Sequence, residues 1–195
     1  MRTLTIKEVI QATNGIYLHN QFNISIKGVS TDSRTIKEND LFVPLAGPNF
    51  DGHDFIRQAI EKGAAAALCE LNKKAKVDGL VNEKIILVDN TQLALLSLAT
   101  YYRNLFDIPF VAVTGSVGKT TTKEMIAEIL KTRFEVLKTP GNLNNEIGLP
   151  LTLFKLDEFY DIGVVELGMS GLGEIRRMVN VVKPKVSVIT NIGIT

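Results

Sequence analysis

The chain has 195 residues, of which 45% are hydrophobic and 22% are charged, a balance that suits one large or two small globular domains. Its 22 Lys and Arg residues offset its 21 Asp and Glu residues, and the net charge of +1 provides no basic field for nucleic acid or anionic lipid. A single cysteine, Cys69, excludes an internal disulfide, and two histidines, His19 and His53, make a zinc cluster unexpected.

The N-terminal segment, Met1 to Glu8, lacks the apolar core of a signal peptide. The sequence also lacks a run of about 18 uninterrupted apolar residues, the length that spans a membrane. We therefore expect a cytoplasmic protein that neither inserts into membranes nor binds nucleic acid, and we expect a monomer.

The first half of the chain alternates apolar and amphipathic runs, as α/β proteins do. Thr5 and Glu8 have the spacing of a capping box, which predicts a short helix that ends at Gly15. Ile24 and Ile26 alternate with polar neighbours and predict a half-buried strand. The other elements predicted in this half are strands at 41–45, 64–69 and 84–89, and a helix at 54–62 that stops at Gly63.

The second half has a stronger strand–helix rhythm, which predicts a parallel sheet. Segment 91–106 is rich in Leu and Ala, lacks Gly and Pro, and predicts a buried helix. Pro150 suits the first turn of a short helix. The remaining predictions are strands at 110–113, 134–137, 162–167 and 186–190, a helix at 173–182, and a helix at 120–133 with Met125, Ile126, Ile129 and Leu130 on one side.

The polar segment 71–83 separates the two halves. We place a boundary near residues 80 to 90, and predict one domain at 1–86 and a second at 87–195. The expected fold class is α/β, with a small N-terminal α/β domain followed by a parallel-sheet domain.

A glycine-rich loop lies between the predicted strand 110–113 and the predicted helix 120–133, which is the context of a phosphate-binding P-loop. Small residues let backbone N–H groups close around phosphate oxygens, and the start of a helix favours an anion. The common P-loop has a glycine five residues before the glycine of its Gly-Lys pair. Val113 occupies that position here, so the loop is a shortened variant. We predict a nucleotide-phosphate site made of Gly115, Ser116, Val117, Gly118, Lys119, Thr120 and Thr121. The alternative is a glycine turn with an exposed lysine.

Within this site, Lys119 has the reach to contact the β- and γ-phosphates, and the Thr120 hydroxyl suits Mg²⁺. Glu166 ends the apolar strand 162–167, at the edge of a parallel sheet where ligands bind, and is predicted to hold Mg²⁺ directly or through water. The alternative for Glu166 is a surface glutamate. The polar loop 139–148 carries three asparagines, although spacing alone favours an ordinary turn there.

Together these segments resemble the Mur ligases of peptidoglycan synthesis, which are ATP-dependent amide-forming enzymes. The resemblance rests on the phosphate loop 114–121, the asparagine loop and the segment 165–169. In the first half it rests on segments 31–34, 40–45 and 51–55. It implies that the first domain binds a UDP-muramoyl peptide, and that the second is a central P-loop ATP-binding domain of which this chain holds part.

The resemblance also implies roles for individual residues. Lys119 and Glu166 would be catalytic, Lys119 through the phosphates of ATP, and Thr120 and Glu166 would hold Mg²⁺. The UDP-sugar substrate would be contacted by Ser33, Arg34, Asn49, Asp51, Gly52 and His53, and the substrate side of the phosphate site would be lined by Asn142, Asn144 and Asn145. Without the resemblance, we would instead expect Ser33 and Arg34 to form a solvated turn, and His53 to lie on the surface at the start of a helix.

The implied reaction joins D-alanyl-D-alanine to UDP-N-acetylmuramoyl-tripeptide through an acyl phosphate. Three alternatives stay open. One is the family member that adds the third amino acid, which the Gly168–Met169 pair disfavours. Another is a ParA/MinD-like ATPase switch, which carries a lysine where this loop has Thr114. The third is a nucleotide-binding module without turnover.

The family pattern continues past residue 195 with a metal-site histidine, a carbamylated lysine and a C-terminal domain that binds the amine substrate. The isolated chain is therefore expected to be a partial enzyme without activity.

Overall fold

The computed structural model describes residues 1–17, 23–79 and 84–193, so His19 lies outside the described residues. The residues group by spatial proximity into two compact units, Met1–Leu98 and Ala99–Thr195. The division falls inside helix α3 (Thr91–Arg103), which the sequence assigned wholly to the second domain. In the described ranges, no helix is both long and apolar enough to cross a membrane.

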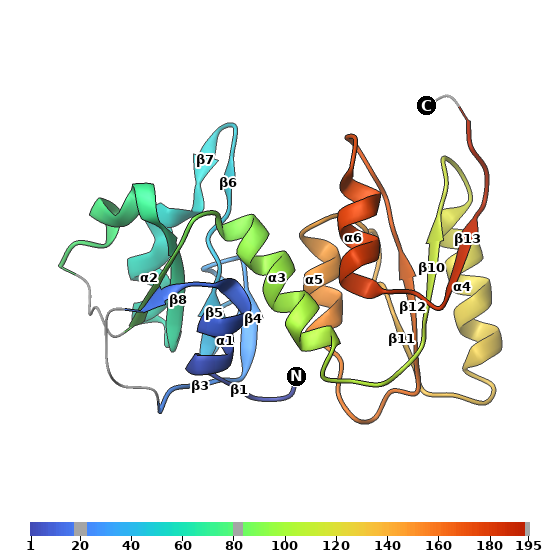
Figure 1. Ribbon diagram of the computed structural model, residues 1–195, viewed down its shortest axis with the longest axis horizontal. Coiled ribbons are helices and arrows are strands. Elements are labelled where there is room, and N and C mark those ends of the chain that lie inside the picture. Colours follow the sequence, from blue (N-terminus) through green and yellow to red (C-terminus); the bar gives the residue numbers. More distant parts are fainter. Residues whose placement is uncertain (18–22, 80–83, 194–195) are drawn as a thin grey trace. The chain divides into compact units, whose positions relative to one another are not determined.

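The first unit is built on a sheet in the order β2-β9-β8-β5-β4, in which β2 runs antiparallel to β9 and the other neighbours are parallel (Figure 1). Two short antiparallel pairs, β1–β3 and β6–β7, accompany it. The strands are β1 (Leu4–Thr5), β2 (Ile16–Tyr17), β3 (Ser25–Ile26), β4 (Gly28–Ser30), β5 (Asp40–Phe42), β6 (Ala46–Gly47), β7 (Phe50–Asp51), β8 (Ala66–Glu70) and β9 (Ile85–Val88). The helices are α1 (Ile6–Thr13), η1 (Gly52–Phe55), α2 (Ile56–Glu61) and η2 (Leu71–Val77).

Helix α1 begins at the predicted capping box. The Thr5 side chain accepts the Glu8 N–H at 3.3 Å, and the Glu8 carboxylate accepts the Thr5 N–H at 2.7 Å, so two of the amides left unpaired at a helix start are satisfied. The helix ends at Thr13, and its C-cap is Asn14, one residue before the predicted Gly15, because Asn14 itself takes the left-handed conformation with φ of 51°.

Strand β8 forms the centre of the first unit, and all five of its residues are buried. Cys69 on this strand is completely buried, and burial raises the pKa of its thiol to about 11. The thiol is therefore a small apolar packing group at neutral pH.

The second unit is a four-stranded parallel sheet in the order β11-β12-β10-β13, which confirms the predicted parallel arrangement. Its strands are β10 (Phe110–Thr114), β11 (Val136–Lys138), β12 (Ile162–Glu166) and β13 (Val186–Ile189), and its helices are α4 (Lys119–Leu130), α5 (Gly148–Leu153) and α6 (Glu174–Val182). Figure 1 shows α4 on one side of this sheet and α5 and α6 on the other. The Tyr102 hydroxyl of α3 donates to the Leu156 carbonyl at 2.6 Å.

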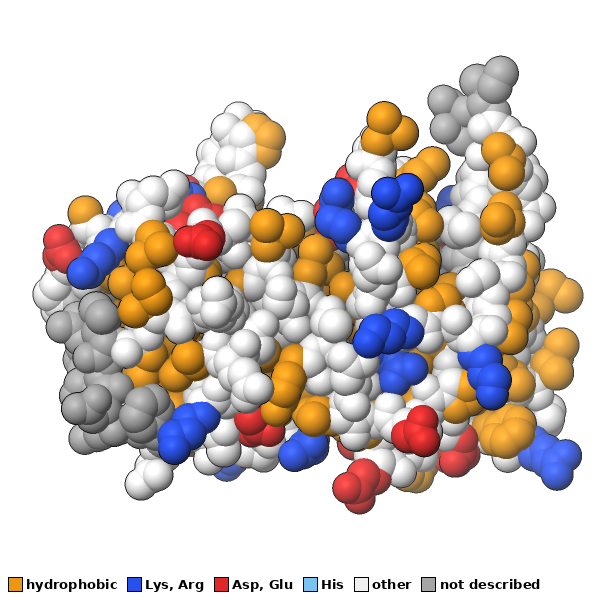
Figure 2. All heavy atoms as spheres, viewed as in Figure 1, with side chains coloured by type: hydrophobic (Ala, Val, Ile, Leu, Met, Phe, Trp, Pro, Cys, Tyr) orange, Lys and Arg blue, Asp and Glu red, His pale blue; other side chains and the backbone are white. Residues whose placement is uncertain are grey.

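Helix α4 packs differently from its apolar pattern. Met125 and Ile129 are 62% and 69% exposed, whereas Lys123 and Ala127 are fully buried. Exposed hydrophobic side chains accordingly appear over α4 and β13 at the right of Figure 2. Grouping apolar residues on one side of the helix therefore did not identify the face that meets the sheet.

Candidate functional site

The phosphate loop joins the end of β10 to the start of α4, as predicted. Gly115 and Gly118 have φ of 138° and 84°, a region that favours glycine. A Cβ on Gly115 would lie 2.1 Å from the Thr190 hydroxyl, so no larger residue fits there. These two glycines let the chain turn sharply from the strand into the helix.

A second segment, Thr190–Gly193, supports this loop and was missed by the sequence analysis. The Asn191 side-chain oxygen accepts the Val117 N–H at 2.9 Å, and the Asn191 carbonyl accepts the Ser116 N–H at 3.2 Å. The Thr190 hydroxyl donates to the Val117 carbonyl at 2.6 Å. In the sequence these residues only follow a predicted strand. Their contact with the phosphate loop could have been inferred only from the pairing of β13 with β10, which brings the ends of the two parallel strands together.

Lys119 lies across the loop. Its Nζ donates to the Gly115 carbonyl at 2.7 Å and to the Ser116 carbonyl at 3.2 Å. Lys119 is also the first residue of α4, where backbone N–H groups and the helix dipole favour an anion. One ammonium group and the start of a helix of 12 residues thus converge on the same loop.

Glu166 is the centre of the predicted metal site, and it is 2% exposed. The Thr120 hydroxyl donates to Glu166 Oε2 at 2.9 Å, and the Asn144 side-chain amide donates to Glu166 Oε1 at 2.7 Å. The Glu166 N–H donates to the Thr139 hydroxyl at 3.0 Å. The structure therefore brings Thr120, Glu166 and Asn144 together from three different elements.

The donor set of this cluster fits a magnesium ion. The Thr120 hydroxyl and the Glu166 carboxylate offer hard oxygen atoms, the ligands that Mg²⁺ prefers, while the Asn144 amide orients the carboxylate by donating to it. Among the described residues, no group of three or more His, Cys, Asp or Glu side chains is placed to hold a metal. A site with one hydroxyl and one carboxylate suits Mg²⁺, which is commonly held by one or two protein groups together with substrate phosphates.

The three asparagines of the loop after β11 differ in their surroundings. Asn144 belongs to the Glu166 cluster, and its carbonyl also accepts the Gly168 N–H at 2.7 Å. The Asn145 side chain accepts the Gly148 N–H at 2.8 Å and so caps the start of α5. Asn142 is exposed. Asn144 is thus the member of the three that lies in the candidate site.

A cavity of about 530 Å³ lies in the first unit, at the carboxyl ends of β4 and β5. Three of the predicted substrate residues line it: Ser33, Arg34 and Gly52. Phe50 and Phe55 also line it, and they are 59% and 45% exposed. The sequence did not indicate a role for these two rings, although exposed aromatic rings beside a cavity are suited to hold a flat ligand ring.

Ser33 and Arg34 are fixed by neighbours. The Ser33 hydroxyl donates to Gln58 Oε1 at 2.8 Å. The Arg34 guanidinium donates to both carboxylate oxygens of Asp32 and holds the pKa of that carboxyl down at about 2. Arg34 itself remains 83% exposed, so its charge is oriented and still accessible.

The Asp51 and His53 side chains brace the fold next to the cavity. His53 is 1% exposed; its Nδ1 lies 2.6 Å from Asp51 Oδ1, and its Nε2 accepts the Glu70 N–H at 3.2 Å. An accepting Nε2 places the ring proton on Nδ1, facing Asp51. Asn49 is exposed beside β7 and lies outside the cavity lining.

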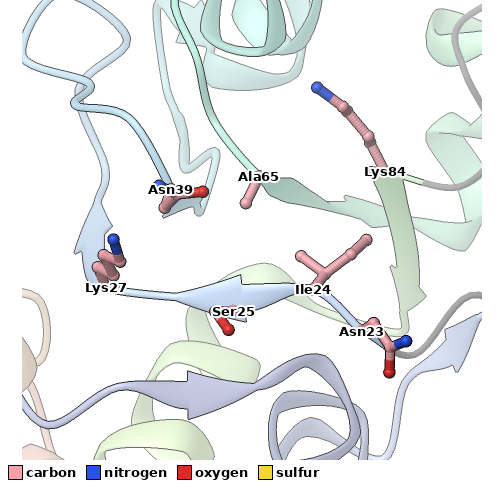
Figure 3. A pocket seen from close by; sticks show the side chains of 7 residues that line it. All are labelled: Asn23, Ile24, Ser25, Lys27, Asn39, Ala65 and Lys84. Carbon is pink, nitrogen blue, oxygen red and sulfur yellow. The ribbon is translucent and has the colours of Figure 1, made fainter.

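A second cavity in this unit, of about 550 Å³, lies at the amino ends of the strands and contains none of the predicted site residues. Figure 3 shows Lys27 and Lys84 on either side of it. Ser33, Arg34 and Gly52 therefore line the cavity at the carboxyl ends of the parallel strands, where α/β proteins bind ligands.

Two family profiles match the chain. Residues 25–103 match the profile described as "Mur ligase family, catalytic domain", and residues 113–195 match "Mur ligase middle domain". The chain belongs to the Mur ligase family.

Mur ligase relatives match nearly the whole chain. It is 43% identical over 190 residues to the UDP-N-acetylmuramoyl-tripeptide–D-alanyl-D-alanine ligase of Bacillus subtilis, covering 97% of this chain and 41% of that protein. It is 38% identical over 192 residues to the ligase of the same name from Escherichia coli, covering 98% of this chain and 41% of that protein. The chain thus spans less than half the length of the curated relatives it matches.

Solved Mur ligases share this fold. A MurF structure from Acinetobacter baumannii has a TM-score of 0.87 at 36% identity, covering 99% of this chain and 42% of that one. The MurF ligase of Thermotoga maritima in complex with ADP has a TM-score of 0.75 at 38% identity, covering 85% of this chain and 37% of that one.

Proposed function

We propose that this chain forms the UDP-sugar-binding and nucleotide-phosphate-binding part of a MurF-type ligase. The complete enzyme would join D-alanyl-D-alanine to UDP-N-acetylmuramoyl-tripeptide with consumption of ATP. The observation that carries this proposal is the assembly of Thr120, Asn144 and Glu166 beside the Lys119 loop. The names of relatives at 37–43% identity support the choice of substrates.

In this proposal the residues of the second unit bind and orient the reactants. Lys119 and the first amides of α4 hold the phosphates, and Thr120 and Glu166 hold Mg²⁺, with Asn144 fixing the carboxylate. Bound Mg²⁺ supplies positive charge where a carboxylate and a phosphate, both anionic, must approach. The substrate carboxylate would take the γ-phosphoryl group of ATP, with ADP as the leaving group, and become an acyl phosphate. The amine of D-alanyl-D-alanine would then displace phosphate and lose a proton. Catalysis here rests on positioning and charge.

The first unit would hold the UDP end of the substrate in the cavity lined by Ser33, Arg34 and the two phenylalanines. Arg34 offers an accessible positive charge that suits a diphosphate, and Phe50 and Phe55 offer faces for a flat ring. Because the chain covers 41% of its relatives, we propose that it binds substrate and nucleotide without ligating them.

The alternative Mur ligase, which adds the third amino acid, is less well supported. A solved UDP-N-acetylmuramoyl-L-alanyl-D-glutamate–2,6-diaminopimelate ligase has the same fold, with a TM-score of 0.65, but only 18% identity. A ParA/MinD-like switch is set aside by the family membership, because both halves of the chain match Mur ligase profiles.

Calorimetric titration of this chain tests the proposal. We expect UDP-N-acetylmuramoyl-tripeptide to bind, and ADP with Mg²⁺ to bind separately. A chain that dimerises with ATP and ignores the UDP-linked peptide would contradict the proposal. In a complete enzyme carrying this sequence, Lys119→Ala should abolish ligation; unchanged turnover would rule out the assigned phosphate site.

A further inference from the structure

Lys123 is a charged residue for which the proposed chemistry has no role so far. It lies on α4, and its side chain is fully buried. Removing an ammonium group from water is strongly unfavourable unless other groups compensate its charge. An apolar side chain of similar length would fill the same space, so the charge itself needs an explanation.

The Lys123 ammonium faces the candidate metal site. Its Nζ donates to the Thr139 carbonyl at 3.0 Å, and it lies 3.0 Å from Glu124 Oε1 and 4.0 Å from Glu166 Oε2. Glu166 Oε2 is the oxygen that accepts the Thr120 hydroxyl. The ammonium therefore lies beside the carboxylate oxygen that the proposed function assigns to Mg²⁺.

The neighbours of the Lys123 ammonium hold it in one position. Glu124, its second carboxylate neighbour, is 41% exposed and is shared with Lys138. Glu166 is 2% exposed, so water screens its interaction with Lys123 only weakly. The hydrogen bond from Lys123 Nζ to the Thr139 carbonyl at 3.0 Å also holds the ammonium in this position.

We propose that Lys123 is a positioning residue that acts through Glu166, as a permanent counter-ion of the metal-binding carboxylate. It holds Glu166 in place before the metal arrives, and it then opposes the metal's charge, so that Mg²⁺ binds firmly only when nucleotide phosphates add their negative charge. This inference rests on the proposed function, because it takes Glu166 and Thr120 as metal ligands.

The direction in which the Mn²⁺ affinity changes distinguishes this role from one in which Lys123 only supports the fold. Mn²⁺ replaces Mg²⁺, and binding to the full chain with ADP is followed by the electron paramagnetic resonance of free Mn²⁺. Lys123→Met should bind Mn²⁺ about tenfold more tightly, because a cation near Glu166 has been removed. Lys123→Arg keeps the charge and should stay near the original affinity. A brace would give weaker or unchanged binding in Lys123→Met, and either result would overturn the inference.

A second variant covers the case in which Lys123→Met does not fold. Glu124→Gln alters a partly exposed neighbour and leaves the Lys123 charge less compensated, so it should weaken Mn²⁺ binding severalfold. Unchanged binding in this variant would also count against the inference. Lys131→Met, at the exposed C-cap of the same helix, is the control and should leave Mn²⁺ binding unchanged.

The experiment also distinguishes this inference from the proposed function. If the unaltered chain binds no Mn²⁺ with ADP, both the metal site and the role of Lys123 are wrong. If the unaltered chain binds Mn²⁺ and both Lys123→Met and Glu124→Gln leave the affinity unchanged, only the role of Lys123 is wrong.

Discussion

The Asn191 side chain accepts the backbone N–H of Val117 at 2.9 Å, although the two residues are 74 positions apart in the chain. This bond, with the contacts of Thr190, connects the end of one parallel strand to the phosphate loop that follows its neighbour. A loop with two glycines has many accessible conformations. The contact reduces them in the absence of nucleotide.

Removing this support should weaken nucleotide binding. Asn191→Ala leaves the Val117 amide without its side-chain acceptor, so the loop must be ordered when phosphate arrives. We expect ADP affinity to fall by about tenfold, which corresponds to about 1.4 kcal/mol. Ser187→Ala, at an exposed position on β13, is the matched control. Equal ADP affinity in the two variants, measured by calorimetry, would show that the contact does not shape the loop.

Removing the loop lysine should remove phosphate affinity while preserving the fold. Among the described residues, the hydrogen bonds of Lys119 Nζ run to the Gly115 and Ser116 carbonyls of its own loop, so Lys119→Met removes an ammonium group from the phosphate site at little structural cost. We expect ADP affinity to fall more than about tenfold, since charge-assisted hydrogen bonds contribute about 1.5–3 kcal/mol. Lys155→Met, at an exposed position of the same unit, should bind ADP normally. Circular dichroism melting should be unchanged in both.

The exposed rings beside the cavity of the first unit should contribute to substrate affinity. Phe55→Ala removes a ring that is 45% exposed, so its loss should affect ligand binding more than stability. We expect binding of UDP to weaken about three- to tenfold, since an aromatic pair contributes about 0.5–1.5 kcal/mol. Phe159→Ala removes a ring that is 65% exposed from the second unit and should have no effect. Isothermal titration with UDP tests both, and identical affinities would place the substrate elsewhere.

The stability of the first unit should depend on pH through Asp51. Burial alone would raise the pKa of this carboxyl, but hydrogen bonds from Lys76 and His53 outweigh burial and lower the pKa below its ordinary 3.8. A carboxyl whose pKa is lowered by folding stabilises the fold above pH 3.8 and loses that effect as the pH falls further. Asp51→Asn should therefore melt lower than the unaltered chain at pH 7, and the gap should narrow below pH 3.8. Asp78→Asn, at an exposed position of the same unit, should melt close to the unaltered chain at every pH in the range.

Strong local signals made most of the fold predictable from the sequence. The turn from β10 into α4 requires glycines and a helix start in immediate succession, and the capping box at Thr5 and Glu8 is equally local. The Thr120–Glu166 contact was also predictable, because parallel strands end at one edge of a sheet.

Features that depend on tertiary contacts were not predictable in the same way. The apolar side predicted for helix α4 includes Met125, yet Met125 is exposed, and Lys123 is buried because carboxylate and carbonyl partners surround it. The two-residue strands β6 and β7 leave almost no pattern in the sequence. His53 resembled a surface residue because its partners Asp51 and Glu70 come together only in the folded unit.

The buried thiol of Cys69 has a practical consequence for studying this molecule. A group with no accessible surface and little thiolate at neutral pH will not react with maleimide reagents. The sequence contains no other cysteine, so the native chain would not itself be labelled by reagents directed at an introduced cysteine. A fluorophore or spin label attached through a cysteine introduced at Val117 or Phe55 would report on each unit separately, without any prior removal of native thiols.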